Sequence, residues 1–87
     1  MPNAVGGNLS DLQQLATNLK NSGQQVVQLK NGCDRAVQSA VWTGPAADRF
    51  RGEWAQFAPV MAKLQIALDE ASREVDRRRD AIDTATR

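Results

Sequence analysis

The chain of 87 residues lacks histidine and tyrosine and carries a single cysteine, and these absences exclude several kinds of site. Without histidine, neither a Cys/His zinc site nor a histidine-based catalytic relay can be built. Because Cys33 is the only cysteine, its thiol is either free or bridged to another chain. A domain of this size is close to the limit at which one hydrophobic core suffices. We therefore expect a single domain over residues 1–87, with no metal, no cofactor and no small-molecule substrate.

The chain also lacks a large excess of either basic or acidic residues, and it lacks a long apolar run. The 11 basic and 10 acidic residues leave a net charge of +1, which argues against a dedicated nucleic-acid binder with a basic face. No apolar run approaches the roughly 20 residues that span a bilayer. The N-terminus has no basic region followed by an apolar segment, so no cleavable signal peptide is expected. The sequence predicts a soluble protein made in the cytoplasm, and any export must follow a route that reads no cleavable leader.

What the chain does contain is a strong break near its midpoint, Trp42-Thr43-Gly44-Pro45. Glycine can adopt the positive φ that ends a helix, and proline has the φ of a first helical turn. The break therefore predicts the bend of an antiparallel two-helix hairpin. The expected order is a flexible arm over residues 1–8, a helix over 9–41, a turn over 42–45 and a helix over 46–85.

Heptad spacing of the apolar residues supports both helices. With Leu12 as position a, the first segment keeps its phase for about four heptads, and the second keeps its own phase from Ala47 almost to the end of the chain. Asn8 or Ser10 is the expected N-cap of the first helix. The residues expected to pack within the hairpin and the dimer lie at positions a and d: Leu12, Leu15, Leu19, Val26, Leu29, Phe50, Trp54, Phe57, Met61, Leu64, Leu68 and Val75.

Two features oppose unbroken helices. Asn31-Gly32 is a turn dipeptide, yet the heptad phase is the same on both of its sides, which favours one continuous helix. Pro59 lies on the outer face of the second helix, where it removes one hydrogen bond, and a gentle bend is expected there rather than a break.

The apolar stripe is wider than the seam of two helices requires. A lone hairpin would leave part of this stripe in water, whereas a second hairpin would cover it. We therefore predict an all-α hairpin that dimerises, obligately or nearly so, into a four-helix bundle. The apolar residues beyond positions a and d are Ala16, Val27, Val37, Val41, Ala46, Ala58, Val60, Ile66 and Ala67.

The midpoint of the chain resembles a known family. Trp42-Thr43-Gly44, followed by Pro45-Ala46-Ala47-Asp48-Arg49-Phe50 and then Trp54, is similar to the WXG family of early-secreted-antigen-like substrates of type VII (ESX) secretion systems. The resemblance covers nearly the whole chain. It implies dimerisation with itself or with a paralogous WXG partner, and secretion out of the cell by a membrane-bound ATPase machine. Trp42, Thr43 and Gly44 are then the expected turn and secretion-recognition motif.

One part of the family pattern is missing. Family members carry a Tyr-x-x-x-Asp/Glu motif in the C-terminal tail, which forms a bipartite export signal with the Trp-Xaa-Gly bend of the partner. This chain has no tyrosine, and its segment of similar spacing is Val75-Asp76-Arg77-Arg78-Arg79-Asp80. The chain then supplies only the Trp-Xaa-Gly half of the signal, uses a divergent tail, or is not exported.

Single residues allow structural and functional interpretations. Trp42 can hold the turn by packing, can be recognised by another protein, or can do both. Cys33 at position a is most simply a small buried thiol, since no histidine is present to activate it. Arginines 77–79 lie among acidic residues, which favours a solvated helix face over a nucleic-acid contact. Asp69 and Glu70 are adjacent on one helix rather than across a cleft, so no enzymatic activity is expected.

A second functional class remains open beside the secretion substrate. A cytoplasmic helical adaptor or chaperone that masks a larger effector, and is never released, would have the same hairpin. A helix-turn-helix DNA binder is disfavoured, because its helices would be shorter and its recognition helix more basic.

Overall fold

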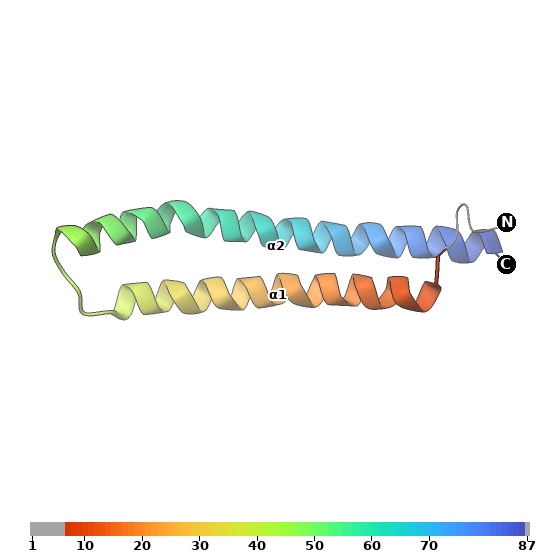
Figure 1. The fold of residues 1–87 in the computed structure, drawn as a ribbon, viewed down its shortest axis with the longest axis horizontal. Coiled ribbons are helices and arrows are strands. Elements are labelled where there is room, and N and C mark those ends of the chain that lie inside the picture. Colours follow the sequence, from red (N-terminus) through yellow and green to blue (C-terminus); the bar gives the residue numbers. More distant parts are fainter. Residues whose placement is uncertain (1–6, 87) are drawn as a thin grey trace.

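Two long antiparallel helices make up the described part of the protein (Figure 1). The computed structural model describes residues 7–86, so most of the arm predicted over residues 1–8 lies outside the described residues. Helix α1 spans Leu9–Ser39 and helix α2 spans Pro45–Thr86. They lie side by side in a rod that measures 65 × 17 × 14 Å between Cα atoms. The described chain is all-helical, as its heptad pattern predicts.

Helix α1 begins with a side-chain cap and runs through the suspected break. The Oδ1 atom of Asn8 accepts a hydrogen bond from the backbone N–H of Asp11 at 3.0 Å. Such a cap typically stabilises a helix by about 1 kcal/mol. The helix continues across Asn31-Gly32 and ends at Ser39, two residues before the predicted end at Val41. It ends early because Ala40 takes an extended conformation with ψ 130°, which starts the connection to α2.

Helix α2 begins at a backbone conformation that suits glycine. Gly44 has a φ of 111°, and its carbonyl oxygen accepts a hydrogen bond from the N–H of Asp48 at 3.0 Å. Pro45 follows as the first helical residue, where its missing N–H costs nothing. Pro59 lies inside the helix without ending it. In Figure 1, α2 arches away from α1 in its green segment and then straightens.

The two helices meet through positions a and e of their heptads, and not through a and d. Ala16 and Ser72, both at position e, are buried, and so is Ala47 at position a. Gly23, also at position e, is buried, and a Cβ atom placed on it would lie 3.4 Å from the carbonyl oxygen of Gln65. These small residues let the helices approach closely, so each helix is rolled toward its e positions and position d leaves the seam.

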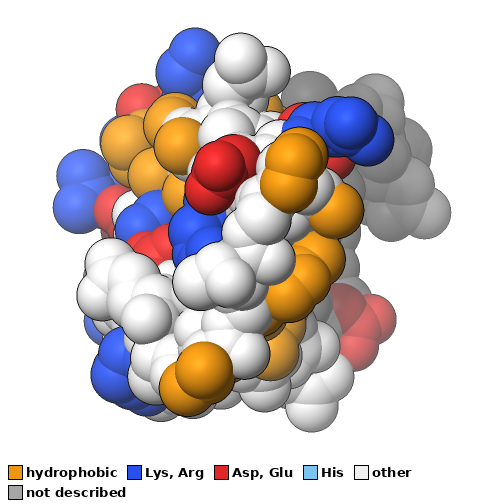
Figure 2. Space-filling model, turned by 90° about the vertical axis from the view of Figure 1, so that its left-hand side faces the viewer, with side chains coloured by type: hydrophobic (Ala, Val, Ile, Leu, Met, Phe, Trp, Pro, Cys, Tyr) orange, Lys and Arg blue, Asp and Glu red, His pale blue; other side chains and the backbone are white. Residues whose placement is uncertain are grey.

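The roll leaves the d positions of both helices on one exposed flank of the rod. In an antiparallel pair, equivalent heptad positions of both helices lie on the same side of the plane that contains the two axes. Position d of both helices therefore forms one flank and position b forms the opposite one. Seen from the loop end, Figure 2 shows hydrophobic side chains in a band down one side of the rod and in a smaller group on the other side. We call the exposed set Leu15, Leu29, Phe50, Phe57 and Leu64 the d flank.

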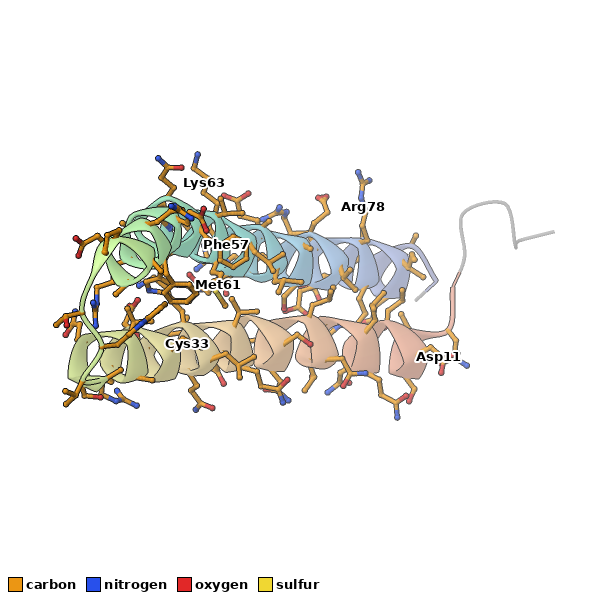
Figure 3. The ribbon with its side chains drawn as sticks, turned by 60° about the vertical axis from the view of Figure 1, so that its left-hand side comes forward. Asp11, Cys33, Phe57, Met61, Lys63 and Arg78 are labelled. Atoms are coloured by element: carbon orange, nitrogen blue, oxygen red, sulfur yellow. The ribbon has the colours of Figure 1, made fainter. Side chains whose placement is uncertain are left out.

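Opposite the arch of α2, one position-a side chain of α1 is exposed. Cys33 is exposed, so the prediction of a buried thiol at this position is wrong. The physical reason is the arch, which lifts α2 away from this part of α1 (Figure 1). Figure 3 shows Met61 on the side of α2 that faces α1, whereas Lys63 and Arg78 point away from it.

Candidate functional site: the hairpin tip

Residues 40–44 form the loop that joins the helices and contain the three residues of the predicted motif. A Cβ atom added to Gly44 would meet nothing within 4 Å, so space does not require glycine there. The requirement comes from the backbone, because a φ of 111° is strained for any residue with a side chain. Gly44 is thus explained by local geometry alone.

Trp42 is both packed and accessible. Its ring lies 5.9 Å from the ring of Phe50, centroid to centroid, with the two planes tilted by 51°. A tilted aromatic pair at this distance is attractive by about 1 kcal/mol beyond the area it buries. The side chain is still 45% exposed. Trp42 and Phe50 form part of the wall of a shallow, mostly apolar depression of about 180 Å³, which is also lined by Ala36, Val37, Ala40 and Arg51.

Arg51, in the second turn of α2, holds the loop by hydrogen bonds to backbone carbonyl groups. Its Nη1 atom donates a hydrogen bond to the carbonyl oxygen of Trp42 at 2.8 Å. Its Nη2 atom donates to the carbonyl oxygens of Ala40 at 3.2 Å and Val37 at 3.5 Å. Helix α1 has no basic residue in its own last turn, so Arg51 provides the cation that usually stabilises helix C-terminal carbonyls.

Comparison with protein families assigns the chain. The model of the WXG100 family, described as proteins of 100 residues with WXG, matches residues 7–85, and the Trp-Xaa-Gly of this chain lies at the hairpin tip. The chain belongs to the WXG100 family. The resemblance drawn from residues 42–54 is thereby confirmed. Comparison with curated proteins and with solved structures gave no significant match. Membership implies a small helical protein of the ESX-secreted class, whose members are not known enzymes.

The role of Arg51 in this WXG100 protein was not predicted from the sequence. The predicted motif stopped at residue 44, and the longer resemblance passed from Phe50 to Trp54 without assigning a role to the arginine between them. A signal was present, because Arg51 occupies an e position on the packed side of α2, where a long cation needs acceptors. Its acceptors could not be identified without the path of the loop.

The second tryptophan lies deeper along the rod and belongs to a polar group. The indole N–H of Trp54 donates a hydrogen bond to Oδ1 of Asp34 at 2.6 Å, and the ammonium group of Lys30 lies 2.9 Å from Oδ2. The hydrogen bond from Lys30, followed by that from Trp54, holds the pKa of Asp34 below its usual value. Trp54 therefore tethers α2 to α1 by a side-chain hydrogen bond in addition to its packing against Phe57.

The predicted packing residues of the WXG100 chain divide into two groups. None of the large ones in the described chain is fully buried. Those at position a are half-buried in the hairpin seam, namely Leu12, Leu19, Val26, Trp54, Met61, Leu68 and Val75. Those at position d are the exposed residues of the d flank. The first group thus packs in the seam between the helices, whereas the second stays exposed, although Phe50 also contacts Trp42 and Phe57 also contacts Trp54.

In the arginine-rich segment of α2, Arg77 and Arg78 are exposed, whereas Arg79, at position e, is half-buried. Arg77 and Arg78 lie 3.5 and 3.3 Å from the carboxylate of Glu74, and Arg79 lies 3.1 Å from Asp80. Arg78 at position d is exposed, so it interrupts the apolar band rather than entering the seam.

The described residues contain neither a helix suited to a membrane span nor a group of metal ligands. In the part of the chain that the structure covers, no helix combines the length and hydropathy of a membrane span. Within residues 7–86, no three acidic or cysteine side chains are grouped in a way that could hold a metal ion.

Proposed function

We propose that this WXG100 protein is a dimeric export substrate or secretion partner of a type VII secretion system, acting by protein–protein contacts. The single observation that carries the proposal is the tip, where the Trp42 ring is supported by Phe50 and Arg51 and still exposes 45% of its surface. A tryptophan with only a packing role would be expected to bury more of its surface. In this proposal, residues 42–44 are the half of the export signal that the chain provides.

The d flank supports the dimer. Its five large side chains are each 44–62% exposed, while the only buried hydrophobic residues among those described are Ala16 and Ala47. Covering the exposed part of a side chain of this size stabilises by about 1 kcal/mol, since full burial contributes roughly 1.5–3 kcal/mol. A second hairpin laid along the d flank would complete a four-helix bundle.

The missing tyrosine bears on the choice of partner. A homodimer of this chain would lack the Tyr-x-x-x-Asp/Glu tail motif in both copies, because the chain has no tyrosine. A paralogous partner would bring that motif and complete the bipartite signal. The mass of the purified chain, alone and co-expressed with a paralogous WXG protein, distinguishes these two arrangements.

The missing tyrosine also favours a second candidate, a cytoplasmic adaptor or chaperone that masks a larger effector. Fractionation of the producing cell tests both. Accumulation in the culture medium without lysis supports the secretion role, whereas retention with the cells while a known secreted control is exported contradicts it. A Trp42→Phe variant that folds and dimerises as the parent does, but stays in the cells, would assign recognition to the indole.

A further inference from the structure

We propose that Arg51 is a positioning residue that holds the tip loop, so that the Trp42 indole meets its partner in one orientation; this inference rests on the proposed role of the tip in recognition. Arg51 itself is half-buried on the packed side of α2 and acts through the backbone of the loop.

The end of α1 does not hold the loop by itself. Among the described residues between Ser39 and α2, one backbone hydrogen bond reaches α1. It runs from the N–H of Ala40 to the carbonyl oxygen of Ala36. Residues 41–43 have no helical or strand structure, and α1 has no cation in its last turn. A loop of this kind would sample several conformations unless another element fixed it.

Arg51 and its neighbour Phe50 hold both the backbone and the side chain of the loop. One guanidinium group takes the carbonyl oxygens of Val37, Ala40 and Trp42, so it links the end of α1 to the middle of the loop. Phe50, adjacent in α2, supports the ring of Trp42. Both the backbone and the ring of Trp42 are therefore held by consecutive residues of one rigid helix.

A rigid loop raises the fraction of molecules in which Trp42 has the orientation that its partner binds. If release of the Trp42 carbonyl let the loop move and drew the ring away from Phe50, three equally populated χ1 wells would leave a competent fraction of about one third. Apparent affinity for a partner falls by the same factor, about threefold, without the loss of any contact to that partner. Arg51 thus contributes to recognition by pre-organisation.

Two substitutions of Arg51 and one control test the positioning directly. Arg51→Gln removes the charge and the fork of donors, and Arg51→Lys keeps the charge but presents a compact ammonium that cannot hold three carbonyls in the same way. Arg49→Gln is the control, since Arg49 is exposed and makes no hydrogen bond or ion pair in the described part of the chain. In a Trp54→Phe background, Trp42 is the only tryptophan and reports its own motion.

The expected result is lower fluorescence anisotropy and stronger acrylamide quenching of Trp42 in Arg51→Gln, an intermediate effect in Arg51→Lys, and no change in Arg49→Gln. Helicity by circular dichroism should stay at the parent value in all three. Unchanged anisotropy and quenching in Arg51→Gln would overturn the proposal. If Arg51→Gln loses helicity, Arg51→Lys decides instead: parent-like anisotropy in that variant also overturns it.

Export from the producing cell then tests the link to recognition in the chain with both tryptophans. Arg51→Gln should reduce the amount in the medium by about threefold, and Arg51→Lys should reduce it by less. Export at the parent level, together with a more mobile Trp42, would overturn the link. Normal export of Trp42→Phe would instead contradict the proposed role of the tip, while the fluorescence result would still report whether Arg51 holds the loop.

Discussion

Ser72 and Ala16, 56 residues apart in the chain, are joined by a buried hydrogen bond from the Ser72 hydroxyl to the Ala16 carbonyl oxygen at 2.7 Å. The bond lies where the helices approach through small side chains. We predict that Ser72→Ala lowers the free energy of unfolding by about 1 kcal/mol through loss of this bond. Ser72→Leu should cost roughly 1–3 kcal/mol more, because its added volume separates the helices. Chemical denaturation measures both, and equal stability of the two variants would contradict the close approach.

Substitution by alanine should change the free energy of unfolding in opposite directions at Gly32 of α1 and at Gly44 of the tip. Gly32 lies inside α1, and a Cβ added there would meet nothing within 4 Å. Gly32→Ala should therefore raise the free energy of unfolding by about 0.5–1 kcal/mol through helix propensity. Gly44→Ala should lower it by about 1–2 kcal/mol, because alanine is strained at a φ of 111°. Thermal unfolding of the two variants side by side checks the contrast, and a stabilising Gly44→Ala would argue against the positive φ.

Stability should fall in acid through Asp34. Hydrogen bonds from Lys30 and Trp54 lower the pKa of this carboxyl in the folded chain. Its contribution is therefore present above the unfolded pKa of about 3.9, and is lost as the pH falls through the lower folded pKa. Asp34→Asn should reduce stability at neutral pH and should show a smaller loss below about pH 4 than the parent does.

Unfolding followed by Trp54 fluorescence in a Trp42→Phe background measures this effect. Glu70→Gln is the matched control, since Glu70 is exposed and makes no hydrogen bond or ion pair in residues 7–86. An Asp34→Asn profile parallel to that of the parent at every pH would mean that the lowered pKa does not contribute to folding.

Two aliphatic residues on different sides of α2 test the dimer. Leu64 on the d flank and Ile66 outside it are 48% and 52% exposed, so they differ mainly in the direction they face. Leu64→Gln should cost about 1 kcal/mol per chain in a symmetric dimer, which raises its dissociation constant tenfold or more. Ile66→Gln should leave it nearly unchanged. Sedimentation at several concentrations measures both, and equal effects would place the interface elsewhere.

Part of this architecture follows from the sequence and part depends on how the helices meet. The heptad phase predicts two helices, and Gly44-Pro45 predicts the bend, because both are local properties of the chain. The roll that buries Ala16, Gly23 and Ser72 depends on the register between the two helices, which neither heptad pattern contains by itself. For this reason a seam through positions a and d was expected and a seam through a and e was found.

At the tip, too, one role follows from the sequence and another depends on the tertiary structure. The backbone role of Gly44 follows from residue type and position. The role of Arg51 depends on the route by which three carbonyl groups return to its guanidinium, across 9 to 14 residues of chain. A contact of this range is decided by tertiary geometry, so the heptad position of Arg51 does not identify its acceptors.

Because the thiol of Cys33 is exposed, the unsubstituted chain can be labelled there for a distance measurement. As the only cysteine, it accepts one spin label or fluorophore without any substitution, and it lies closer to the tip than to the far end of α1. In a symmetric pair, two such labels define a single distance. Parallel rods would bring the labels near each other, and antiparallel rods would set them apart along the axis, so one dipolar measurement reports the relative direction of the two hairpins.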